Sequence, residues 1–271
     1  MDIGGRVAIV TGGGSGIGES LCRAFAEGGA RAVVVADING SDADRVAAGI
    51  TAAGGRSVAH ALDVGIEAEV VDLVRRTEET FGPVDVFVAN AGVAVVGGVE
   101  VPDEEWQRLW QVNVAAHIYA ARAVLPGMLA RGEGYLVHTA SAAGLLTQLD
   151  SAPYSVTKHA VVALAEWLAI THGDAGVRVS CLCPQAVETG MTRRLIERQR
   201  RRGTEPDGVL QPADVARAVL AAMAAEEFLI LPHPKVATYE QRRAGDRDHW
   251  LAGMRGLQAR MDARRRPRPA T

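Results

Sequence analysis

Short runs of apolar residues alternate along the chain with longer segments in which apolar residues recur every three or four positions. The short runs are rich in valine and uninterrupted by charge, a pattern typical of strands buried on both faces in a parallel sheet. They predict seven strands, at residues 6–10, 32–36, 57–61, 84–89, 135–139, 177–183 and 228–231.

The longer segments predict helices, because apolar side chains spaced by three or four residues share one helical face. These helices cover about 16–27, 41–53, 66–81, 102–130, 152–172 and 212–225. Strands separated by helices imply right-handed crossovers between parallel neighbours. Residues 1–231 are therefore expected to form a single α/β domain with a doubly wound parallel sheet.

Residues 232–271 lie outside this alternation and are predicted to form a partly helical extension. Trp250, Met254, Leu257 and Met261 recur at helical spacing, so they would form an apolar stripe. Two interpretations remain open: the stripe covers a neighbouring subunit, or it packs on its own domain. The arginine-rich end of the extension is predicted to be disordered.

The composition excludes several classes of protein. Of the 271 residues, 48% are hydrophobic, which indicates a globular chain. Its 29 basic and 32 acidic residues give a formal net charge of −3, so neither nucleic acid nor an anionic membrane is expected as a partner. No uncharged apolar run approaches the ~20 residues of a membrane span, and no signal peptide is expected before the first strand.

The cysteines and histidines carry no ligand pattern. Cys22, Cys181 and Cys183 lack C-x-x-C spacing, and the last two lie on one face of a predicted strand. Buried free thiols are the expected state, and they indicate a reducing, cytoplasmic location. The seven histidines are scattered along the chain, so no metal is predicted.

A glycine-rich turn connects the first predicted strand to the first predicted helix. Gly12, Gly16 and Gly18 follow a run of apolar residues, and the helix begins within the turn. A helix N-terminus has unpaired N–H groups and a partial positive charge, and glycine lets a phosphate approach the backbone closely. In this position the turn favours dinucleotide binding, as in a Rossmann fold. Its glycine spacing differs from the commoner G-x-G-x-x-G fingerprint.

Asp37 ends the second predicted strand, 19 residues after Gly18. A carboxylate there accepts hydrogen bonds from both hydroxyls of the adenosine ribose and repels a 2′-phosphate. No arginine or lysine stands beside Asp37 or at Ser15, so the sequence favours NAD(H) over NADP(H). The alternative is an ordinary aspartate that caps a turn. Asp63 follows the third strand and is a candidate partner for the adenine amino group, with the backbone of Val64 beside it.

Tyr154 and Lys158 lie four residues apart and so share one face of a helix. The lysine count favours a specific role for Lys158, because Lys158 and Lys235 are the only lysines in an arginine-rich chain. A free tyrosine has a pKa of about 10, and a nearby ammonium and a nicotinium ring would lower the pKa toward that of a working base.

Two further polar residues belong with this pair. Ser141 follows the fifth strand, at the edge where α/β sheets bind ligands, and its hydroxyl would hold the substrate oxygen during hydride transfer. Asn113 is a candidate to hold a water that relays protons to Lys158. The alternative for Asn113 is a buried polar residue satisfied by a neighbouring backbone.

Together these residues resemble one family. Thr11-Gly12-x-x-x-Gly16-x-Gly18, Asn90-Ala91-Gly92, Asn113, Ser141 and Tyr154-x-x-x-Lys158 are similar to the motifs of the short-chain dehydrogenase/reductase family, in the same order over residues 4–231. The resemblance implies that Ser141, Tyr154 and Lys158 form the catalytic triad, with Asn113 as a fourth member. It departs at Gln185, where relatives usually carry glycine.

The resemblance also implies a set of contacts with the cofactor and the substrate. The expected cofactor contacts are Gly12, Ser15, Gly16, Ile17, Gly18, Asp37, Ile38, Asp63, Val64, Asn90, Ala91, Gly92, Tyr154, Lys158, Pro184, Val187, Thr189 and Met191. The expected substrate contacts are Ser141, Leu145, Gln148, Tyr154 and Gln185.

The implied activity is NAD(H)-dependent interconversion of a secondary alcohol and a ketone, with Tyr154 transferring the proton. The expected substrate is a small and mainly apolar molecule, and the expected assembly is a homotetramer or homodimer. Two alternatives remain: an NADPH-preferring carbonyl reductase, and a cofactor-binding regulator without catalysis.

Overall fold

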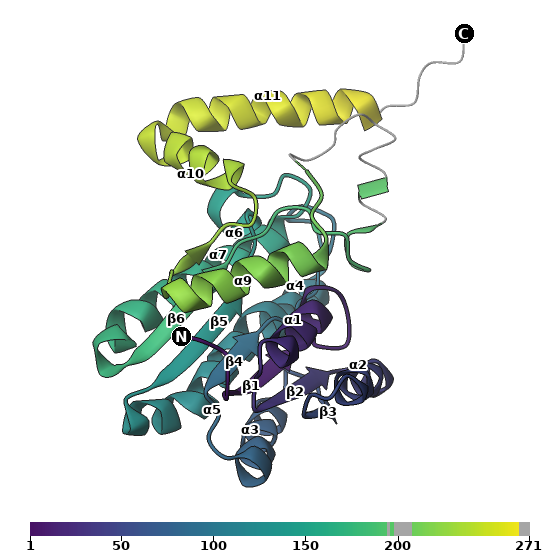
Figure 1. Ribbon diagram of the computed structural model, residues 1–271. Helices are drawn as coiled ribbons and strands as arrows, with labels where there is room; N and C mark the ends of the chain where they lie inside the picture. Colours follow the sequence, from purple (N-terminus) through teal and green to yellow (C-terminus); the bar gives the residue numbers. More distant parts are fainter. Residues whose placement is uncertain (194–195, 198–207, 266–271) are drawn as a thin grey trace.

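The computed structural model describes residues 1–193, 196–197 and 208–265, and it contains one seven-stranded parallel sheet (Figure 1). The strands lie in the order β3-β2-β1-β4-β5-β6-β7. Their bounds are β1 Val7–Thr11, β2 Ala32–Asp37, β3 Ser57–Ala61, β4 Val86–Ala89, β5 Gly134–Thr139, β6 Val177–Leu182 and β7 Leu229–Ile230. All seven predicted strands are confirmed, and no end moves by more than two residues.

Helices cover both faces of the sheet. Successive side chains of a strand point to opposite faces, so every residue of the central strands β1 and β4 is buried. One core lies under α3 (Glu67–Phe81), α5 (Ala116–Arg131) and α7 (Ala152–His172). The other lies under α1 (Gly16–Glu27), α2 (Gly40–Ala52) and α9 (Pro212–Ala225). The doubly wound parallel α/β fold is therefore confirmed.

The order of strands reverses between β1 and β4, which are neighbours although two strands separate them in sequence. Chains that leave β1 and β4 turn toward opposite faces of the sheet, which opens a crevice at their carboxyl ends. Ligands of such sheets bind in this crevice. The glycine-rich turn follows β1 there, and Asn90 follows β4.

The long helical region predicted at 102–130 is three consecutive segments. It begins as α4 (Asp103–Trp110), continues through the π-helical turn Gln111–Ala115 and ends as α5. A π turn adds a residue to the helical repeat and is frequent at functional sites. The short helix α6 (Ala143–Leu146) precedes α7 and was not expected from the sequence.

The C-terminal extension forms two helices, α10 (Lys235–Gly245) and α11 (Arg247–Arg265), which lie above the end of the sheet (Figure 1). Trp250 packs on Tyr239 of α10 with ring centroids 6.3 Å apart, so this part of the stripe covers its own chain. Leu257 remains exposed. Disorder was predicted over 264–268; this is wrong at its start, because α11 continues to Arg265, and residues 266–271 lie outside the described residues. Among the described helices, none is long and apolar enough to cross a membrane.

Two histidines meet inside the core, one on β5 and one on α5. Nδ1 of His117 and Nδ1 of His138 are 3.0 Å apart, so the neutral rings hold complementary tautomers, one donating and the other accepting. Within the described residues, no hydrogen-bonding group reaches Nε2 of either ring. Burial lowers the pKa of His138 to about 4 and that of His117 well below its ordinary value.

We expect acid to destabilise the protein through this pair. Below the ordinary histidine pKa of 6.5, the unfolded chain binds protons that the folded chain does not, so the free energy of unfolding decreases as the pH falls. His138 alone accounts for about 3 kcal/mol by pH ~4. Urea titrations between pH ~7 and ~4 test this. The double variant His117→Leu/His138→Leu should lose that part of the slope, and an unchanged slope would contradict the assignment.

Candidate active site

The glycine-rich turn joins β1 to α1 at the carboxyl edge of the sheet. Gly12 has a φ of +64° and Gly16 a φ of +55°, in the left-handed region that favours glycine. A Cβ on Gly18 would overlap the carbonyl oxygen of Gly12, and a Cβ on Gly12 would lie 2.9 Å from Cα of Ala91. Ser15 precedes α1 and makes no side-chain capping bond. The bare turn therefore forms a cradle at the helix N-terminus, where an anion is favoured.

Two carboxylates lie along the same edge, and backbone N–H groups fix their orientation. Asp37 ends β2; its Oδ2 accepts from the N–H of Gly14 at 2.9 Å and its Oδ1 from that of Asn39 at 2.9 Å. Asp63 follows β3, and its Oδ1 accepts from the N–H of Gly65 at 2.8 Å.

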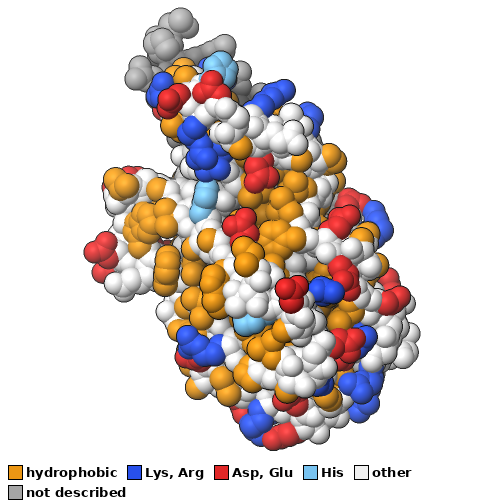
Figure 2. Space-filling view, turned by 90° about the vertical axis from the view of Figure 1, so that its left-hand side faces the viewer, with side chains coloured by type: hydrophobic (Ala, Val, Ile, Leu, Met, Phe, Trp, Pro, Cys, Tyr) orange, Lys and Arg blue, Asp and Glu red, His pale blue; other side chains and the backbone are white. Residues whose placement is uncertain are grey.

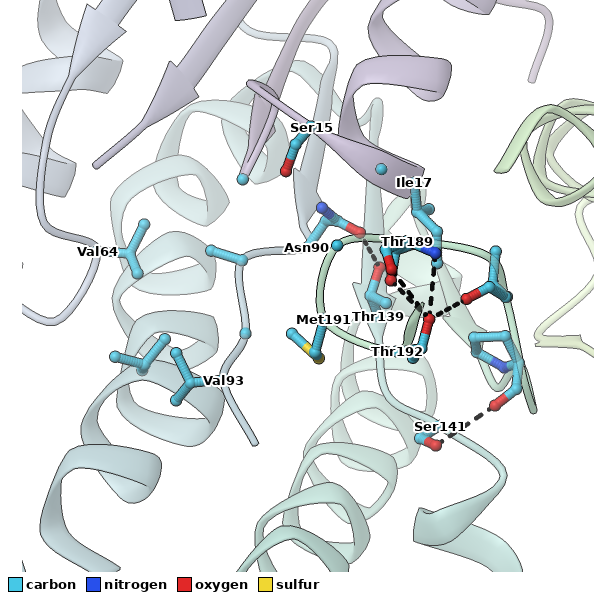
Figure 3. Close-up of a pocket in the computed structure, with 18 of the residues that line it drawn as sticks. Ser15, Ile17, Val64, Asn90, Val93, Thr139, Ser141, Thr189, Met191 and Thr192 are labelled. Carbon is cyan, nitrogen blue, oxygen red and sulfur yellow. Dashed lines mark hydrogen bonds between the residues drawn. The ribbon is translucent and has the colours of Figure 1, made fainter. Parts of the chain in front are cut away.

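A cavity of about 340 Å³ runs from the glycine-rich turn to Tyr154 (Figure 3). Most of the residues predicted to bind cofactor or substrate line it: Gly12, Ser15, Gly16, Ile17, Asp37, Ile38, Asp63, Val64, Asn90, Ala91, Gly92, Ser141, Tyr154, Lys158, Pro184, Gln185, Val187, Thr189 and Met191. Four predicted residues do not: Gly18, Asn113, Leu145 and Gln148. No three metal-ligating side chains come together anywhere in the described part of the chain.

Ser141 and Tyr154 meet at one end of this cavity. Ser141 follows β5, and its Oγ accepts from the N–H of Ala143 at 3.1 Å and donates to the carbonyl oxygen of Pro184 at 3.3 Å. Tyr154 lies in the first turn of α7, which begins after the N-cap Ser151. Burial raises the pKa of the Tyr154 phenol, and a hydrogen bond with Ser141 opposes the rise.

Lys158 lies one helical turn after Tyr154 and is only 3% exposed. Its Nζ donates to the carbonyl oxygen of Thr139 at 2.8 Å and lies 5.7 Å from the centre of the Tyr154 ring. Burial lowers the pKa of Lys158 from 10.5 to about 8. Burial has the largest effect on the pKa of the Tyr154 phenol and raises it, and the lowering of that pKa by the ammonium together with a nicotinium ring stays a prediction for the complex with cofactor.

Asn113 is placed in the π-helical turn with its side chain fully buried. Its Oδ1 accepts from the N–H of Val93 at 2.8 Å, and its Nδ2 donates to the carbonyl oxygen of Val93 at 2.9 Å and to Oγ1 of Thr157 at 3.2 Å. These bonds occupy the amide. The side chain therefore holds the segment around Val93 over the cavity, as the alternative interpretation expects, and its part in a proton relay through water stays a prediction.

Asn90 fastens the ends of three strands together. Its Nδ2 donates to the carbonyl oxygen of Thr11 at 3.0 Å, and its Oδ1 accepts from Oγ1 of Thr139 at 3.2 Å. The backbone N–H of Asn90 donates to Oγ1 of Thr11 at 3.0 Å. The floor of the cavity is thereby held in register before any ligand binds.

The segment after β6 closes the cavity over the glycine-rich turn. Thr192 was not singled out from the sequence, yet its hydroxyl bonds to Val187 and Thr189 and folds the loop back on itself (Figure 3). The side chain of Thr189 then lies beside Gly16, where an added Cβ would meet it at 3.1 Å. The T-x-x-T spacing was the available signal, because a hydroxyl three residues on often bonds within a turn.

The substrate end differs from the sequence prediction. Gln185 lines the cavity as expected, and its N–H donates to Nδ1 of His233 at 3.2 Å, which ties the start of the extension to the site. Leu145 is wrong as a cavity residue, because α6 turns it into the core. The backbone of Gln148 is bonded to the hydroxyl of Ser155, and its side chain does not line the cavity.

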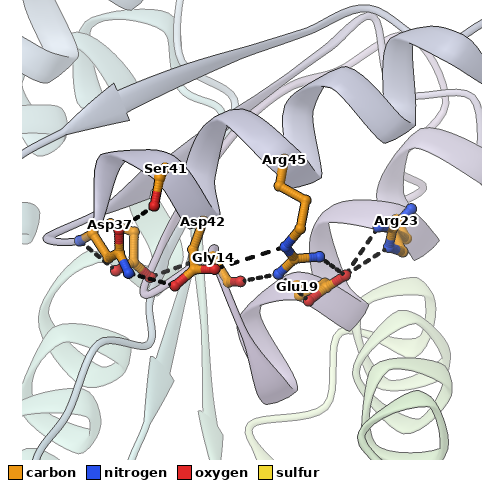
Figure 4. A network of polar contacts seen from close by, with 8 residues as sticks. Gly14, Glu19, Arg23, Asp37, Ser41, Asp42 and Arg45 are labelled. Atoms are coloured by element: carbon orange, nitrogen blue, oxygen red, sulfur yellow. Dashed lines mark hydrogen bonds and ion pairs between the residues drawn. The ribbon is translucent and has the colours of Figure 1, made fainter.

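The sequence has no basic residue beside Asp37 or at Ser15, and the structure adds one that packs against the glycine-rich turn. Arg45, on α2, donates from Nη2 to the carbonyl oxygen of Gly14 at 2.7 Å, and the N–H of that same glycine bonds to Asp37 (Figure 4). Arg45 is eight residues beyond Asp37 in sequence, so only the packing of α2 against the turn reveals it.

Comparison with known proteins agrees with this geometry. The family model described as short chain dehydrogenase matches residues 6–200. The 1-deoxy-11-beta-hydroxypentalenate dehydrogenase of Streptomyces exfoliatus is 38% identical over 235 residues, which cover 85% of this chain and 84% of that protein.

Two solved structures have the same fold. The short-chain dehydrogenase/reductase of Burkholderia phymatum, in complex with NAD, is 32% identical with a TM-score of 0.84 over 92% of this chain and 96% of the other. A 7 alpha-hydroxysteroid dehydrogenase, complexed with NADH and 7-oxo glycochenodeoxycholic acid, is 28% identical with a TM-score of 0.79 over 84% and 93%. The chain therefore belongs to the short-chain dehydrogenase/reductase family of oxidoreductases.

Proposed function

We propose that this protein is an NAD(H)-dependent dehydrogenase that interconverts a secondary alcohol and a ketone. The observation that carries the proposal is that Ser141, Tyr154 and Lys158 share one cavity with the glycine-rich turn and Asp37. One end of that cavity suits a dinucleotide, and the other holds proton-transferring side chains. The NAD-bound and NADH-bound relatives support the choice of cofactor.

The cofactor fits the cradle formed by the glycines. The pyrophosphate would lie at the N-terminus of α1, the adenosine ribose at Asp37 and the adenine beside Asp63 and Val64. The nicotinamide end would lie near Val187 and Thr189. When bound, the cofactor accepts or donates the hydride, which no side chain in this cavity supplies.

Tyr154 would transfer the proton to and from the substrate oxygen. In oxidation the phenolate oxygen would take the proton of the alcohol hydroxyl as the hydride leaves the carbon that bears this hydroxyl; in reduction the phenol would return a proton to the ketone oxygen. Ser141 lies beside Tyr154 and would donate a hydrogen bond to the substrate oxygen, which fixes the reacting carbon.

Lys158 has two tasks in this scheme. Its buried ammonium, now bonded to the carbonyl oxygen of Thr139, would also donate to the nicotinamide ribose hydroxyls. With a pKa of about 8, it remains mostly protonated at neutral pH and favours the phenolate of Tyr154 electrostatically. Asn113 contributes by holding Val93, and hence Gly92, over this lysine.

The substrate is proposed to have an apolar body around the reacting carbon. The apolar side chains of Val93, Val112 and Met191 line the cavity, together with the polar side chain of Gln185. Two of the three relatives named above carry such a molecule in their names, a hydroxypentalenate in one and 7-oxo glycochenodeoxycholic acid in the other.

A screen tests this function directly. The purified chain would be mixed with NAD and a panel of secondary alcohols, and nicotinamide reduction followed by absorbance. We expect cyclic or aromatic alcohols to be oxidised and to outperform polyols. Failure to turn over any alcohol or ketone, with either cofactor, would support the non-catalytic alternative and overturn the proposal.

Replacing Asp37 by alanine is expected to narrow the preference for NAD over NADP. The carboxylate would bond to the ribose hydroxyls and repel a 2′-phosphate, so its removal weakens NAD binding and relieves the repulsion. The ratio of kcat/KM with the two cofactors measures the change, and a hydrogen bond to a charged group predicts roughly tenfold or more. Equal use of both cofactors by the wild type would favour the NADPH-preferring reductase instead.

We also propose that the protein works as a homotetramer or homodimer. The outer face of α7 carries Val156, Trp167 and Ile170, of which Trp167 is 57% and Ile170 83% exposed. Hydrophobic side chains also gather on the face shown in Figure 2. Exposed apolar patches of this kind mark contacts between proteins.

The three free, buried cysteines support a reducing, cytoplasmic setting.

Introducing a charge on α7 tests the assembly. Trp167→Glu is expected to shift the protein toward a smaller oligomer, because each interface would bury two carboxylates without partners. Light scattering after size-exclusion chromatography measures the mass. Glu166→Gln, the neighbouring exposed position, is the control and should leave the mass unchanged. An unaltered oligomer in Trp167→Glu would exclude this face of α7.

A further inference from the structure

The glycine-rich turn is attached to α2 through one arginine. Arg45 donates from Nη2 to the carbonyl oxygen of Gly14 at 2.7 Å (Figure 4). Both its terminal nitrogens also bond to Glu19 of α1, at 3.0 Å to Oε1 and 3.0 Å to Oε2. The guanidinium is thus held in a two-bonded ion pair and by a backbone carbonyl at once.

The same glycine connects this arginine to Asp37. The N–H of Gly14 donates to Oδ2 of Asp37 at 2.9 Å, while its carbonyl accepts from Arg45. A Cβ on Gly14 would lie 2.9 Å from that carboxylate oxygen and 2.8 Å from Cβ of Asp42. A single residue therefore separates the guanidinium from the carboxylate that would bind the adenosine ribose.

The charge of Arg45 is nevertheless compensated. Glu19 accepts from Arg45 and, at 2.9 Å, from Arg23; Asp42 lies 3.7 Å from Nε of Arg45. Hydrogen bonding to Arg45 is the main reason why the pKa of Glu19 is lowered, so this carboxylate is ionised at neutral pH. With Asp37 included, three carboxylates face two guanidinium groups, and the neighbourhood of the ribose site is negative.

We propose that Glu19 is a second determinant of cofactor choice, because it keeps Arg45 engaged and prevents it from binding the 2′-phosphate of NADP. This inference rests on the proposed binding of NAD(H). Asp37 repels the phosphate directly, whereas Glu19 engages Arg45, the cation that bonds to the glycine-rich turn next to Asp37. Guanidinium groups bind phosphate by paired, charge-assisted hydrogen bonds, so an unengaged Arg45 is a suitable partner.

The two carboxylates then act together. Removing Asp37 alone relieves repulsion but leaves Arg45 bonded to Glu19. Removing the charge of Glu19 alone releases Arg45 from its two-bonded ion pair, so that the Gly14 carbonyl and Asp42 are the contacts that remain, but it leaves Asp37 beside the phosphate. Only the double change presents an Arg45 released from Glu19 to a phosphate that Asp37 no longer repels, so the two effects on NADPH binding are expected to be more than additive.

Equilibrium titration of nicotinamide fluorescence with NADH and NADPH measures this without a substrate. We expect Asp37→Ser/Glu19→Gln to bind NADPH at least about tenfold more tightly than Asp37→Ser. Adding Arg45→Met to the double variant should remove that gain, because the phosphate then loses its partner. The gain should also shrink with rising salt, since it is electrostatic.

Glu27→Gln in the Asp37→Ser background is the matched control. It removes an equal charge from the far end of α1 and should leave NADPH binding unchanged. The inference is overturned if Glu19→Gln gives no gain over Asp37→Ser, or if the gain survives Arg45→Met. Failure of the wild type to bind NADH would instead overturn the proposed function, so the two results are distinguishable.

Discussion

Tyr154→Phe is expected to lower kcat by at least about 100-fold while NADH still binds. The substitution removes the phenol that is proposed to exchange a proton with the substrate oxygen, and general acid–base catalysis contributes about 100- to 10,000-fold. The ring itself remains, so the wall of the cavity and the first turn of α7 are kept. Steady-state rates with the best alcohol of the screen, together with an NADH titration, separate these two effects.

Tyr119→Phe is the matched control. Tyr119 lies on α5 and its hydroxyl accepts from Nε2 of Gln111 at 3.0 Å, away from the cavity. Loss of this phenol should leave kcat within about twofold. If Tyr154→Phe keeps more than about a tenth of the wild-type rate, another group transfers the proton.

Gly18→Ala is expected to weaken NADH binding at least about tenfold and to lower the free energy of unfolding. The new Cβ would overlap the carbonyl oxygen of Gly12 and lie 2.8 Å from Nδ2 of Asn90. Both neighbours belong to the floor of the cofactor cradle, so they cannot move without opening the turn. Overpacking of this kind costs roughly 1–3 kcal/mol. Fluorescence titration with NADH and urea denaturation measure the two consequences.

Gly253→Ala provides the comparison for a helical glycine. A Cβ at that position in α11 would meet nothing within 4 Å, so the substitution should be neutral or slightly stabilising through helix propensity. Wild-type NADH affinity in Gly18→Ala would mean that the pyrophosphate lies elsewhere.

The sheet could be predicted because each central strand is buried on both faces, which leaves a short apolar run in the sequence. β1 and β2 show this most clearly, with every residue but Asp37 buried. The π-helical turn at Gln111–Ala115 left no such trace, because its side chains keep a helical pattern. The shared cavity of Ser141, Tyr154 and Lys158 could also be predicted, because the last two lie one helical turn apart and Ser141 follows the end of a strand.

The residues that the sequence could not supply are those brought in by packing of distant segments. Arg45 reaches the glycine-rich turn from the next helix, and His233 reaches Gln185 across 48 residues. Leu145 failed for the opposite reason: α6 turns its apolar side chain inward, and an apolar residue near a cavity has no sequence mark that distinguishes it from the core. The raised pKa of Tyr154 likewise depends on burial, which only the folded chain shows.

The C-terminal extension contacts the site through its first residues, whereas its last helix lies away from the site. His233 is buried against Gln185, α10 packs on α6, and α11 packs mainly against α10. The junction between α10 and α11, at Asp246, is exposed. A protease that cuts there would separate α11 from the chain and leave His233 in place, whereas a cut before His233 would detach the residue that accepts a hydrogen bond from Gln185. Cleavage at Asp246 would thus change the outer surface of the molecule, whereas cleavage about a dozen residues earlier would change the site at Gln185.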